Sequence, residues 1–543
     1  MPVTNSDPSL DEKSPYTTTD ATARIRSEAL QAEDAAAAEH ALTIKDAIRL
    51  YTPAIFWSLL FALGVVVAGF DPQIVGTLVA IPQFQQNFGE FDEDFGGYIV
   101  AAKWQSAFNI AVPVGSTIGA FAIGVPMERW GRRVSMAICC GISAVAIAIQ
   151  FSTNKNKTQL VIAELLNGIA IGGFPVLGPA YISEVSPVVL RGIFTATVNT
   201  AYTTGQLIAS GVLAGTQGRP DKWSYEIPFA CQWIFPIFIL CMLPFCPESP
   251  WWLVRKGDRE GALKALKKLT HSSVDVNQLL VAIERTNKLE LEHIKEASWL
   301  DCFKGSDLRR TLLATLIYAI QPLSGNYLIT GYCVYFFELA GLNPNDAFNF
   351  GVGVLAVGWV GSVLSWLLIA RLGRRQIYNW GLVLLTFLVF MVGVLDVVPR
   401  SQSVVWAQSS MMLIYNFFYD LTIGPLAYVI LSEISSTRLR GKTTAISICF
   451  NDLLYVACGV AVPFAINPDQ GNMRGKLAFV FFGISIVSVI YCFFCLPETK
   501  GRTFAELDIM FLEGTPTRKF EQYTFDVDSN YRREGIVEGD AEK

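Results

Sequence analysis

The chain has 543 residues, 52% of them hydrophobic, and a mean hydropathy of +0.39. Charged residues gather in the two tails and one central segment, which argues against a soluble protein and indicates a polytopic helical membrane protein. The net charge of -5, with no long basic patch, argues against a nucleic-acid partner. No catalytic triad, metal-binding cluster or phosphate loop is evident, so we expect neither an enzyme nor a cofactor.

Residues 1–50 are expected to form a disordered cytoplasmic tail. The first 40 residues are polar and acidic, without the apolar core of a signal peptide. They are too polar to bury the surface that folding needs. Within the tail, Thr43 to Leu50 has the spacing of a short amphipathic helix that enters the first apolar run.

A membrane-spanning helix needs about 20 apolar residues, and the sequence predicts twelve of them. They form two bundles of six helices, over residues 51–249 and 308–498. The predicted spans are 54–80, 97–122, 134–152, 160–182, 193–215, 228–247, 310–338, 347–370, 377–398, 404–431, 443–466 and 476–496.

Two polar segments lie outside the predicted bundles. Residues 250–307 contain two stretches with helical spacing and charged faces, Gly257–Thr270 and Asn277–Ala297, which predict a small intracellular helical domain. Residues 499–543 predict a short helix followed by a cytoplasmic tail. Basic residues of the short loops fall on one side of the twelve spans, which places both termini in the cytoplasm.

The two halves repeat a set of loop motifs. Gly131-Arg132-Arg133 follows span two and Gly373-Arg374-Arg375 follows span eight; Pro-Glu-Ser-Pro ends the first half and Pro-Glu-Thr-Lys-Gly-Arg ends the second. A repeat of six spans predicts two bundles around a central cavity. The charged residues of the motifs are predicted to form inter-helix salt bridges that break when the bundles rock apart, although arginines that only fix the topology are the alternative. They are Glu128, Arg129, Arg132, Arg133, Glu184, Arg191, Glu248, Arg371, Arg374, Arg375, Glu433, Arg438, Arg440 and Glu498.

As a set, these motifs resemble the sugar porter family of the major facilitator superfamily, over about residues 50–515. Three stretches more narrowly resemble the fungal α-glucoside (maltose) permeases: Ile227–Pro236, Pro247–Gly257 and Tyr335–Leu342. The resemblance implies a monomeric, multi-pass proton symporter of the plasma membrane, with a sugar and a proton as its substrates.

Polar residues inside the apolar spans predict the sugar site, because a sugar needs planar hydrogen-bonding groups and aromatic faces in a cavity. Asn199 and Gln206 share one helical face, and further clusters lie around Gly325, before the Gly424-Pro425 break and at Asn451, Asp452 and Tyr455. Any one of these residues has the alternative role of joining helices. The predicted sugar-binding residues are Asn199, Gln206, Gln321, Asn326, Tyr327, Tyr428 and Asn451.

The resemblance adds position-by-position matches at this site. Gln206 and Gln321 stand where sugar porters have sugar-binding glutamines. Pro322 replaces the second glutamine of the usual pair, Asn326 is displaced by one position, and Tyr428 stands where many hexose porters have Trp. These departures favour a sugar other than a hexose, or a larger one.

Asp71 lies within the first apolar run, and a carboxylate at membrane depth is a functional candidate because its burial is costly. Pro72 and nearby glycines are expected to loosen the helix there. The resemblance matches Asp71 to the proton site of sugar symporters, and Glu164 stands where many of those have Arg. We therefore predict that Asp71 and Glu164 hold a proton between them, with Lys103 as the counter-charge. The alternative is a structural hydrogen-bonded pair.

The sequence thus predicts proton-coupled import of an α-glucoside such as maltose. A hexose or polyol facilitator is the nearest alternative. A non-transporting sugar sensor is a third, although the tail after residue 499 is short for one. A drug exporter is disfavoured because exporters of this superfamily lack the two Pro-Glu motifs.

Overall fold

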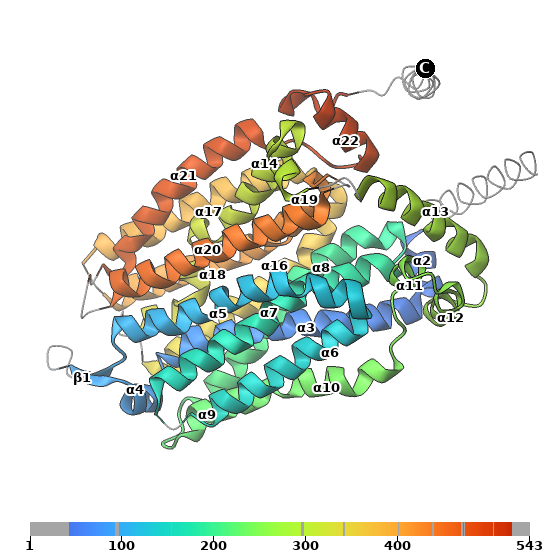
Figure 1. The fold of residues 1–543 in the computed structure, drawn as a ribbon. Helices are drawn as coiled ribbons and strands as arrows, with labels where there is room; N and C mark the ends of the chain where they lie inside the picture. Colours follow the sequence, from blue (N-terminus) through green and yellow to red (C-terminus); the bar gives the residue numbers. More distant parts are fainter. Residues whose placement is uncertain are drawn as a thin grey trace, which may run out of the picture.

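A computed structural model describes residues 43–92, 97–153, 155–294, 298–339, 343–399, 401–436, 439–467, 471, 473–502 and 504–523. In this part of the chain, long helices lie side by side in two groups, drawn in blue to green and in yellow to red (Figure 1). Most of the predicted N-terminal tail, the end of the C-terminal tail and Arg438 lie outside the described residues.

The N-terminal half consists of the helices predicted as spans one to six. Each is helical over nearly the predicted range, because each is a long apolar run, although the sixth is divided into successive short helices. They are α3 (Thr52–Leu78), α5 (Ala102–Ala122), α6 (Gly124–Phe151), α7 (Lys157–Val185), α8 (Val188–Thr216), and the successive α9 (Trp223–Gln232), α10 (Ile234–Met242) and η1 (Leu243–Phe245).

The C-terminal half repeats this order with more interruptions. Its first helix changes into a π-helix at Gln321, and its fourth breaks at Thr422, two residues before the predicted Gly424-Pro425 break. The elements are α14 (Gly305–Gln321), η3 (Pro322–Gly331), α15 (Cys333–Leu339), α16 (Pro344–Arg371), α17 (Arg374–Val397), α18 (Gln402–Leu421), α19 (Ile423–Ile434), α20 (Arg440–Ile466), η4 (Arg474–Leu477) and α21 (Ala478–Cys495).

Ten stretches of helix among the described residues are long and apolar enough to cross a membrane. The two remaining predicted spans coincide with α5 and α8. Both helices are long, but they carry polar side chains such as Asn109 and Gln206 along one face. The count of twelve spans stays a prediction.

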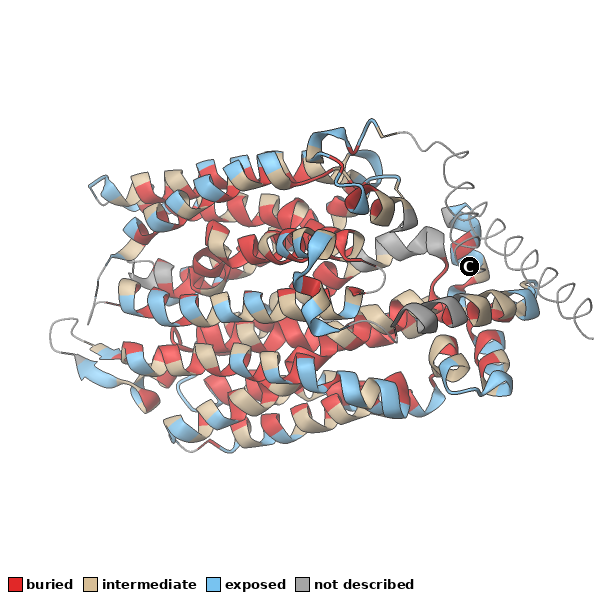
Figure 2. Cartoon of the chain, turned by 45° about the horizontal axis from the view of Figure 1, so that its top comes forward, coloured by how far each residue is buried: buried red, intermediate tan, exposed pale blue. Residues whose placement is uncertain are grey.

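The two halves pack in the same way. In each half the first helix lies along the fifth (α3 with α8, α14 with α20), and the second lies along the fourth (α5 with α7, α16 with α18). The halves meet where α5 contacts α20 and where α8 contacts α16. Figure 2 shows buried residues concentrated between these helices and exposed residues on the outer faces.

One end of the bundle carries a small hairpin, and we call it the hairpin end. There α4 (Pro82–Phe88) is followed by the antiparallel strands β1 (Glu90–Asp92) and β2 (Gly97–Ile99), with Phe91 opposite Tyr98. The predicted span 97–122 was therefore wrong at its start, because its first residues pair with β1 and α5 begins only at Ala102.

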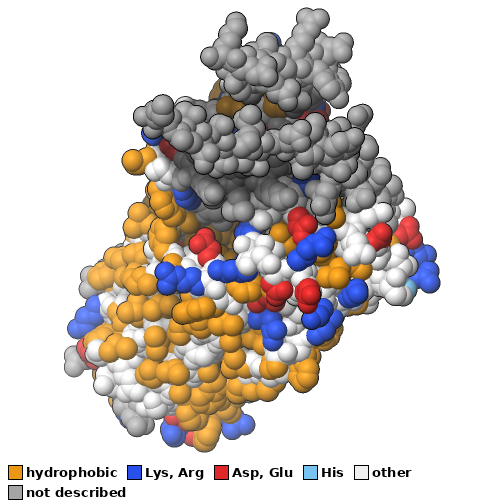
Figure 3. Space-filling model, turned by 45° about the vertical axis from the view of Figure 1, so that its right-hand side comes forward, with side chains coloured by type: hydrophobic (Ala, Val, Ile, Leu, Met, Phe, Trp, Pro, Cys, Tyr) orange, Lys and Arg blue, Asp and Glu red, His pale blue; other side chains and the backbone are white. Residues whose placement is uncertain are grey.

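The opposite end carries short polar helices, and we call it the surface-helix end. Thr43–Leu50 forms α2 (Ile44–Leu50) as predicted, and the two helical stretches of the central segment form α12 and α13. Figure 3 shows charged side chains over this end and hydrophobic ones along the adjoining flank. The other elements here are α11 (Pro250–Arg255), α12 (Arg259–Leu269), α13 (Val276–Ile294), η2 (Trp299–Phe303), α22 (Phe504–Leu512) and η5 (Thr517–Lys519).

Pro72 and the nearby glycines, which were predicted to loosen the first helix, do not interrupt it. Helix α3 continues through Pro72 for 27 residues. It is packed tightly there: a Cβ on Gly69 would collide with the Tyr202 carbonyl of α8. This packing on α8 supports α3 beside the point where the sequence alone predicted a looser helix.

Candidate functional site

A cavity of about 210 Å³ lies between the two halves. Its wall comes from α3, α5, α7 and α8 on one side and from α14, η3, α18, α19 and α20 on the other. All seven residues predicted to bind sugar line it: Asn199, Gln206, Gln321, Asn326, Tyr327, Tyr428 and Asn451. Helices from both halves thus bring together residues up to 252 positions apart in the sequence.

Hydrogen bonds from neighbouring side chains orient several of the amides. Tyr419 donates to Gln321 Oε1 at 2.9 Å, and the Thr330 hydroxyl lies 2.7 Å from Asn326 Oδ1 and 3.1 Å from Asn416 Oδ1. Asn416 in turn donates to the Val354 carbonyl at 3.0 Å. These hydrogen bonds fix which face of each amide points into the cavity.

Tyrosine rings form much of the remaining wall. Tyr318 and Tyr428 meet edge to face with centroids 5.4 Å apart, and Tyr327 lies 5.7 Å from Tyr455. Sequence reasoning missed Tyr202, Tyr318 and Tyr332, which also line the cavity. A tyrosine inside an apolar run was the only available signal, and it does not distinguish a cavity wall from helix packing.

Side chains also connect the two halves directly around the cavity. Asn199 of α8 donates to Ser362 of α16 at 3.1 Å and to Asp420 of α18 at 3.3 Å. Toward the hairpin end, Asn109 of α5 donates to the Tyr332 hydroxyl at 3.0 Å. Gln105 donates to Asn467 at 3.1 Å, one residue beyond α20. These contacts close the halves together on that side of the cavity.

Asp71 and Glu164 lie together, as predicted, and both are fully buried. The Gln150 amide donates to Asp71 Oδ1 at 3.1 Å and to Glu164 Oε1 at 3.0 Å, while Gln232 donates to Asp71 Oδ1 at 2.9 Å. The two carboxyl groups are also within hydrogen-bonding reach of each other.

The second oxygens of both carboxyl groups, Asp71 Oδ2 and Glu164 Oε2, have no donor among the described residues. A hydrogen bond between two carboxyl groups needs a proton on one of them. One proton shared between Asp71 and Glu164 would therefore allow a hydrogen bond between the two carboxyl groups. The geometry suits a shared proton better than two buried negative charges.

Lys103 is not brought to this pair. It lies in the first turn of α5 at the hairpin end and is exposed. Among the described residues, no ion pair joins Lys103 to Asp71 or Glu164. The counter-charge prediction is corrected accordingly: the groups around the pair are neutral amides, Gln150, Gln232 and the nearby Asn167. Sequence reasoning gave no role to these amides.

The carboxyl pair does not line the cavity, although α3 contributes residues to both. Asp71 faces α6, α7 and α9, from which Gln150, Glu164 and Gln232 come. The next two residues, Pro72 and Gln73, line the cavity. A change of charge at Asp71 is therefore connected to a ligand in the cavity through a single helix, α3.

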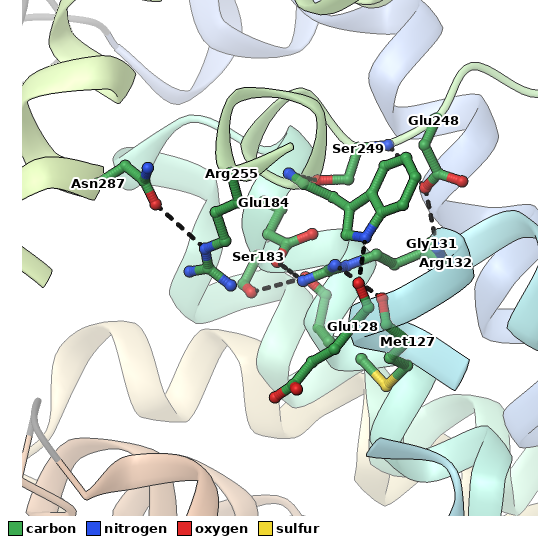
Figure 4. Close-up of polar contacts among 12 residues, drawn as sticks. Met127, Glu128, Gly131, Arg132, Ser183, Glu184, Glu248, Ser249, Arg255 and Asn287 are labelled. Carbon is green, nitrogen blue, oxygen red and sulfur yellow. Dashed lines mark hydrogen bonds and ion pairs between the residues drawn. The ribbon is translucent and has the colours of Figure 1, made fainter. Parts of the chain in front are cut away.

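The repeated loop motif of the N-terminal half forms a compact clamp at the surface-helix end (Figure 4). Arg132 pairs with Glu184 at 2.5 Å, and the Glu248 carboxylate accepts hydrogen bonds from the backbone N–H groups of Arg132 at 3.0 Å and Arg133 at 3.2 Å. Burial raises the pKa of Glu248, and the backbone donors offset part of that rise. Gly131 adopts φ +89, and a Cβ there would lie 2.5 Å from Glu248 Oε2.

The C-terminal half builds the same clamp. Arg374 pairs with Glu433 at 3.2 Å, and Glu498 accepts from the backbone N–H groups of Arg374 at 2.9 Å and Arg375 at 3.2 Å. Both ion pairs join helices of one half, α6 to α7 and α17 to α19. Moving the halves apart does not by itself break them, contrary to the predicted role.

The other charged motif residues differ in their surroundings. Arg133 and Arg375 donate to the carbonyls of Pro244 and Phe493 at 3.1 and 2.9 Å. Glu128, Arg129 and Arg371 are exposed. Arg440 begins α20, the side chain of Arg191 is not described, and Arg438 lies outside the described residues.

Comparison with known sequences gives one family and close relatives. Residues 57–511 match the family model "Sugar (and other) transporter". The general alpha-glucoside permease of Saccharomyces cerevisiae is 34% identical over 505 residues, covering 91% of this chain and 81% of the relative. The maltose permease MAL31 of the same organism is 30% identical over 508 residues, covering 92% and 82%.

Comparison with solved structures shows the fold. The proton:xylose symporter XylE, bound to 6-bromo-6-deoxy-D-glucose, superposes with a TM-score of 0.69 at 20% identity, covering 85% of this chain and 99% of that one. An inward-open structure of XylE from E. coli gives a TM-score of 0.65 at 20% identity, covering 84% and 99%. The chain therefore has the helical fold of the major facilitator superfamily.

Proposed function

The chain belongs to the sugar (and other) transporter family, and from this membership we propose that it imports an α-glucoside such as maltose together with a proton. The observation that carries the proposal is the buried carboxyl pair, Asp71 and Glu164, one helix away from a cavity lined by amides and tyrosines. The names of the yeast relatives support the substrate class, and the departures at Pro322 and Tyr428 favour a sugar other than a hexose.

The cavity residues have the chemistry that a sugar needs. Amides such as Gln206, Gln321 and Asn451 both donate and accept hydrogen bonds, and tyrosine rings such as Tyr327 and Tyr428 present apolar faces to the C–H side of a sugar ring. Because Asn199 and Gln206 come from one half while Gln321 and Asn451 come from the other, a bound sugar bridges the halves.

The proton is held between Asp71 and Glu164. Loading from the acidic outside removes a negative charge from the interior, and release inside restores it. Helix α3 carries this change to the cavity, because Asp71 is followed directly by Pro72 and Gln73. Gly76, one turn further along, packs against η3 of the other half: a Cβ there would lie 2.8 Å from the Gly331 carbonyl.

Alternating access follows from this arrangement. With sugar and proton bound, the halves close at the hairpin end through contacts such as Asn109 to Tyr332 and open at the surface-helix end. The two clamps, Arg132–Glu184 and Arg374–Glu433, keep each half rigid during the movement. The rocking is then a rigid-body movement about the cavity.

The remaining parts of the proposal concern the cell. We place twelve spans in the plasma membrane, with both termini and the surface-helix end in the cytoplasm and the hairpin end outside. The proposed units are the tail 1–50, the bundles 51–249 and 308–498, the intracellular domain 250–307 and the tail 499–543. The protein acts as a monomer in the lipid bilayer.

The test is uptake of labelled maltose by a yeast strain that lacks its own sugar carriers, at external pH 5 and pH 7, with and without an uncoupler. Accumulation at pH 5 that the uncoupler abolishes supports the symporter. Uptake that equilibrates but never accumulates indicates a facilitator. Correct surface expression without uptake of maltose or of glucose indicates a sensor.

A further inference from the structure

The cavity wall contains acidic side chains but, among the described residues, no basic ones. Among the described residues that line it, Asp420 and Asp452 are acidic and none is Lys, Arg or His. The ion pairs of the described chain involve other residues, so neither aspartate has a basic partner there. A carboxylate without a counter-ion acts more strongly on a charged ligand inside a protein than in water, because the effective dielectric constant is lower there.

The two aspartates differ in how far they face the cavity. Asp420 is 4% exposed and accepts a hydrogen bond from Asn199 at 3.3 Å. Asp452 is only half-buried although it lies in the middle of α20 and lines the cavity. The adjacent Leu453 is 60% exposed on the outer face of the same helix. The exposure of Asp452 is therefore toward the cavity.

Asp452 also has unused acceptor capacity. The Thr117 hydroxyl of α5 lies 3.2 Å from Asp452 Oδ2, but it also lies 3.1 Å from the Pro113 carbonyl, and it has one proton to donate. The neighbouring Ser116 hydroxyl is a further donor. An ionised carboxylate has about four acceptor sites, so these two hydroxyls leave Asp452 able to bind a ligand.

From this placement we propose that Asp452 determines the charge preference of the sugar site. Its carboxylate accepts hydrogen bonds from the hydroxyls of a neutral glycoside, attracts a glycoside that carries a protonated amine, and repels one that carries a carboxylate or phosphate. The surrounding tyrosine rings reinforce the preference, because their faces attract cations. This inference depends on one part of the proposed function, namely that the cavity binds a glycoside.

The buried carboxyl pair does not account for such a preference. Asp71 and Glu164 are fully buried and are not among the residues that line the cavity. They contact the amides Gln150 and Gln232 rather than a ligand. Discrimination by charge at the cavity therefore depends on Asp452 and, behind Asn199, on Asp420.

The test compares three ligands that differ only at carbon 6: methyl α-glucoside, its 6-amino-6-deoxy derivative and methyl α-glucuronide. Binding to the purified full-length protein in detergent at pH 7 is measured from the ligand-induced rise in melting temperature. We expect the amine to bind about tenfold or more tightly than the acid, with the neutral glucoside between them. We call the ratio of these two affinities the range. Asp452→Asn should reduce the range to about threefold, while the neutral glucoside still binds.

Two further variants make the test specific. Asp346→Asn removes an exposed acid of α16 outside the cavity wall and should leave the range unchanged. Thr117→Val removes a hydroxyl donor that stabilises the ionised carboxylate of Asp452 and should therefore narrow the range, so it tests the proposal even if Asp452→Asn does not fold.

The outcomes separate this proposal from the proposed function. Equal binding of amine and acid by the wild type, an unchanged range in Asp452→Asn, or no binding of any of the three ligands overturns the role of Asp452. If the range is as expected but the reconstituted protein does not accumulate maltose along a proton gradient, the symport proposal fails and the role of Asp452 stands.

Discussion

In the N-terminal half, Glu248 accepts hydrogen bonds from the backbone of Arg132 and Arg133; in the C-terminal half, Glu498 does the same for Arg374 and Arg375. The ion pairs beside them also correspond, Arg132 with Glu184 and Arg374 with Glu433. The ends of the halves have thus kept one design, which joins the third and fourth helices of each half to the segment after its sixth helix.

The interiors of the halves have diverged. The first helix of the N-terminal half, α3, is continuous and carries Asp71 toward Glu164. Its counterpart, α14, changes into η3, where Gly325 has φ +100 and neutral side chains such as Gln321 and Asn326 line the cavity. We infer a division of labour, with the proton held in the N-terminal half and much of the sugar site in the C-terminal half.

The largest effect is expected from Asp71→Asn, which removes the proton site and leaves the sugar site. A gradient of two pH units supports up to about a hundredfold accumulation, since each unit is worth about 1.4 kcal/mol. The variant should equilibrate sugar without accumulating it, while exchange of labelled for unlabelled maltose persists. Asp346→Asn is the control. Accumulation by Asp71→Asn against a gradient would contradict the division of labour.

Glu164→Gln should weaken coupling in a different way, because a glutamine side chain resembles a carboxyl group that keeps its proton. We expect accumulation to fall about tenfold or more, and the remaining uptake to be the same at external pH 5 and pH 7. Initial rates at the two pH values measure this. A pH dependence as steep as that of the wild type would assign the proton to Asp71 alone.

A smaller effect is expected from the sugar-binding amides. Gln206→Ala in one half and Gln321→Ala in the other should each raise KM about tenfold, from the loss of hydrogen bonds worth about 1.4 kcal/mol. Accumulation at saturating sugar should remain, because the carboxyl pair is intact. Gln278→Ala, at an exposed position of α13, is the control. Loss of accumulation in either cavity variant would show that the sugar and proton sites do not act independently in the two halves.

Much of this arrangement was predictable from the sequence. Apolar runs gave the helices, the repeated motifs gave the two halves, and polar residues inside the runs gave seven positions that all line the cavity. The sequence did not show how each helix is rotated about its own axis. Gln150 and Tyr202 lie in apolar runs like many other residues, and only packing determines that one meets Asp71 and the other the cavity.

The Lys103 prediction shows how an error in one boundary displaces a residue. A span beginning at residue 97 puts Lys103 two turns inside the membrane, close to the depth of a buried acid. Residues 97–99 instead pair with β1, and α5 begins at Ala102, so Lys103 lies at an exposed helix end. Strand pairing across a short hairpin is a tertiary contact that apolar content does not reveal.

The smallest effect distinguishes the two clamps that otherwise look alike. Gly131 and Gly373 both lie against a glutamate carboxylate, but Gly131 has φ +89 whereas Gly373 has φ -73. Alanine at either position crowds the carboxylate, and at position 131 it also requires a backbone conformation, φ +89 and ψ 177, that is strained for any residue but glycine and costs about 1 to 3 kcal/mol. Gly131→Ala should therefore lower the melting temperature in detergent more than Gly373→Ala. Gly131→Asn should recover none of the difference, because the conformation with φ +89 and ψ 177 is open essentially to glycine alone. Equal losses at the two glycines would mean that crowding of Glu248 and Glu498, rather than backbone strain, fixes the residue at both positions.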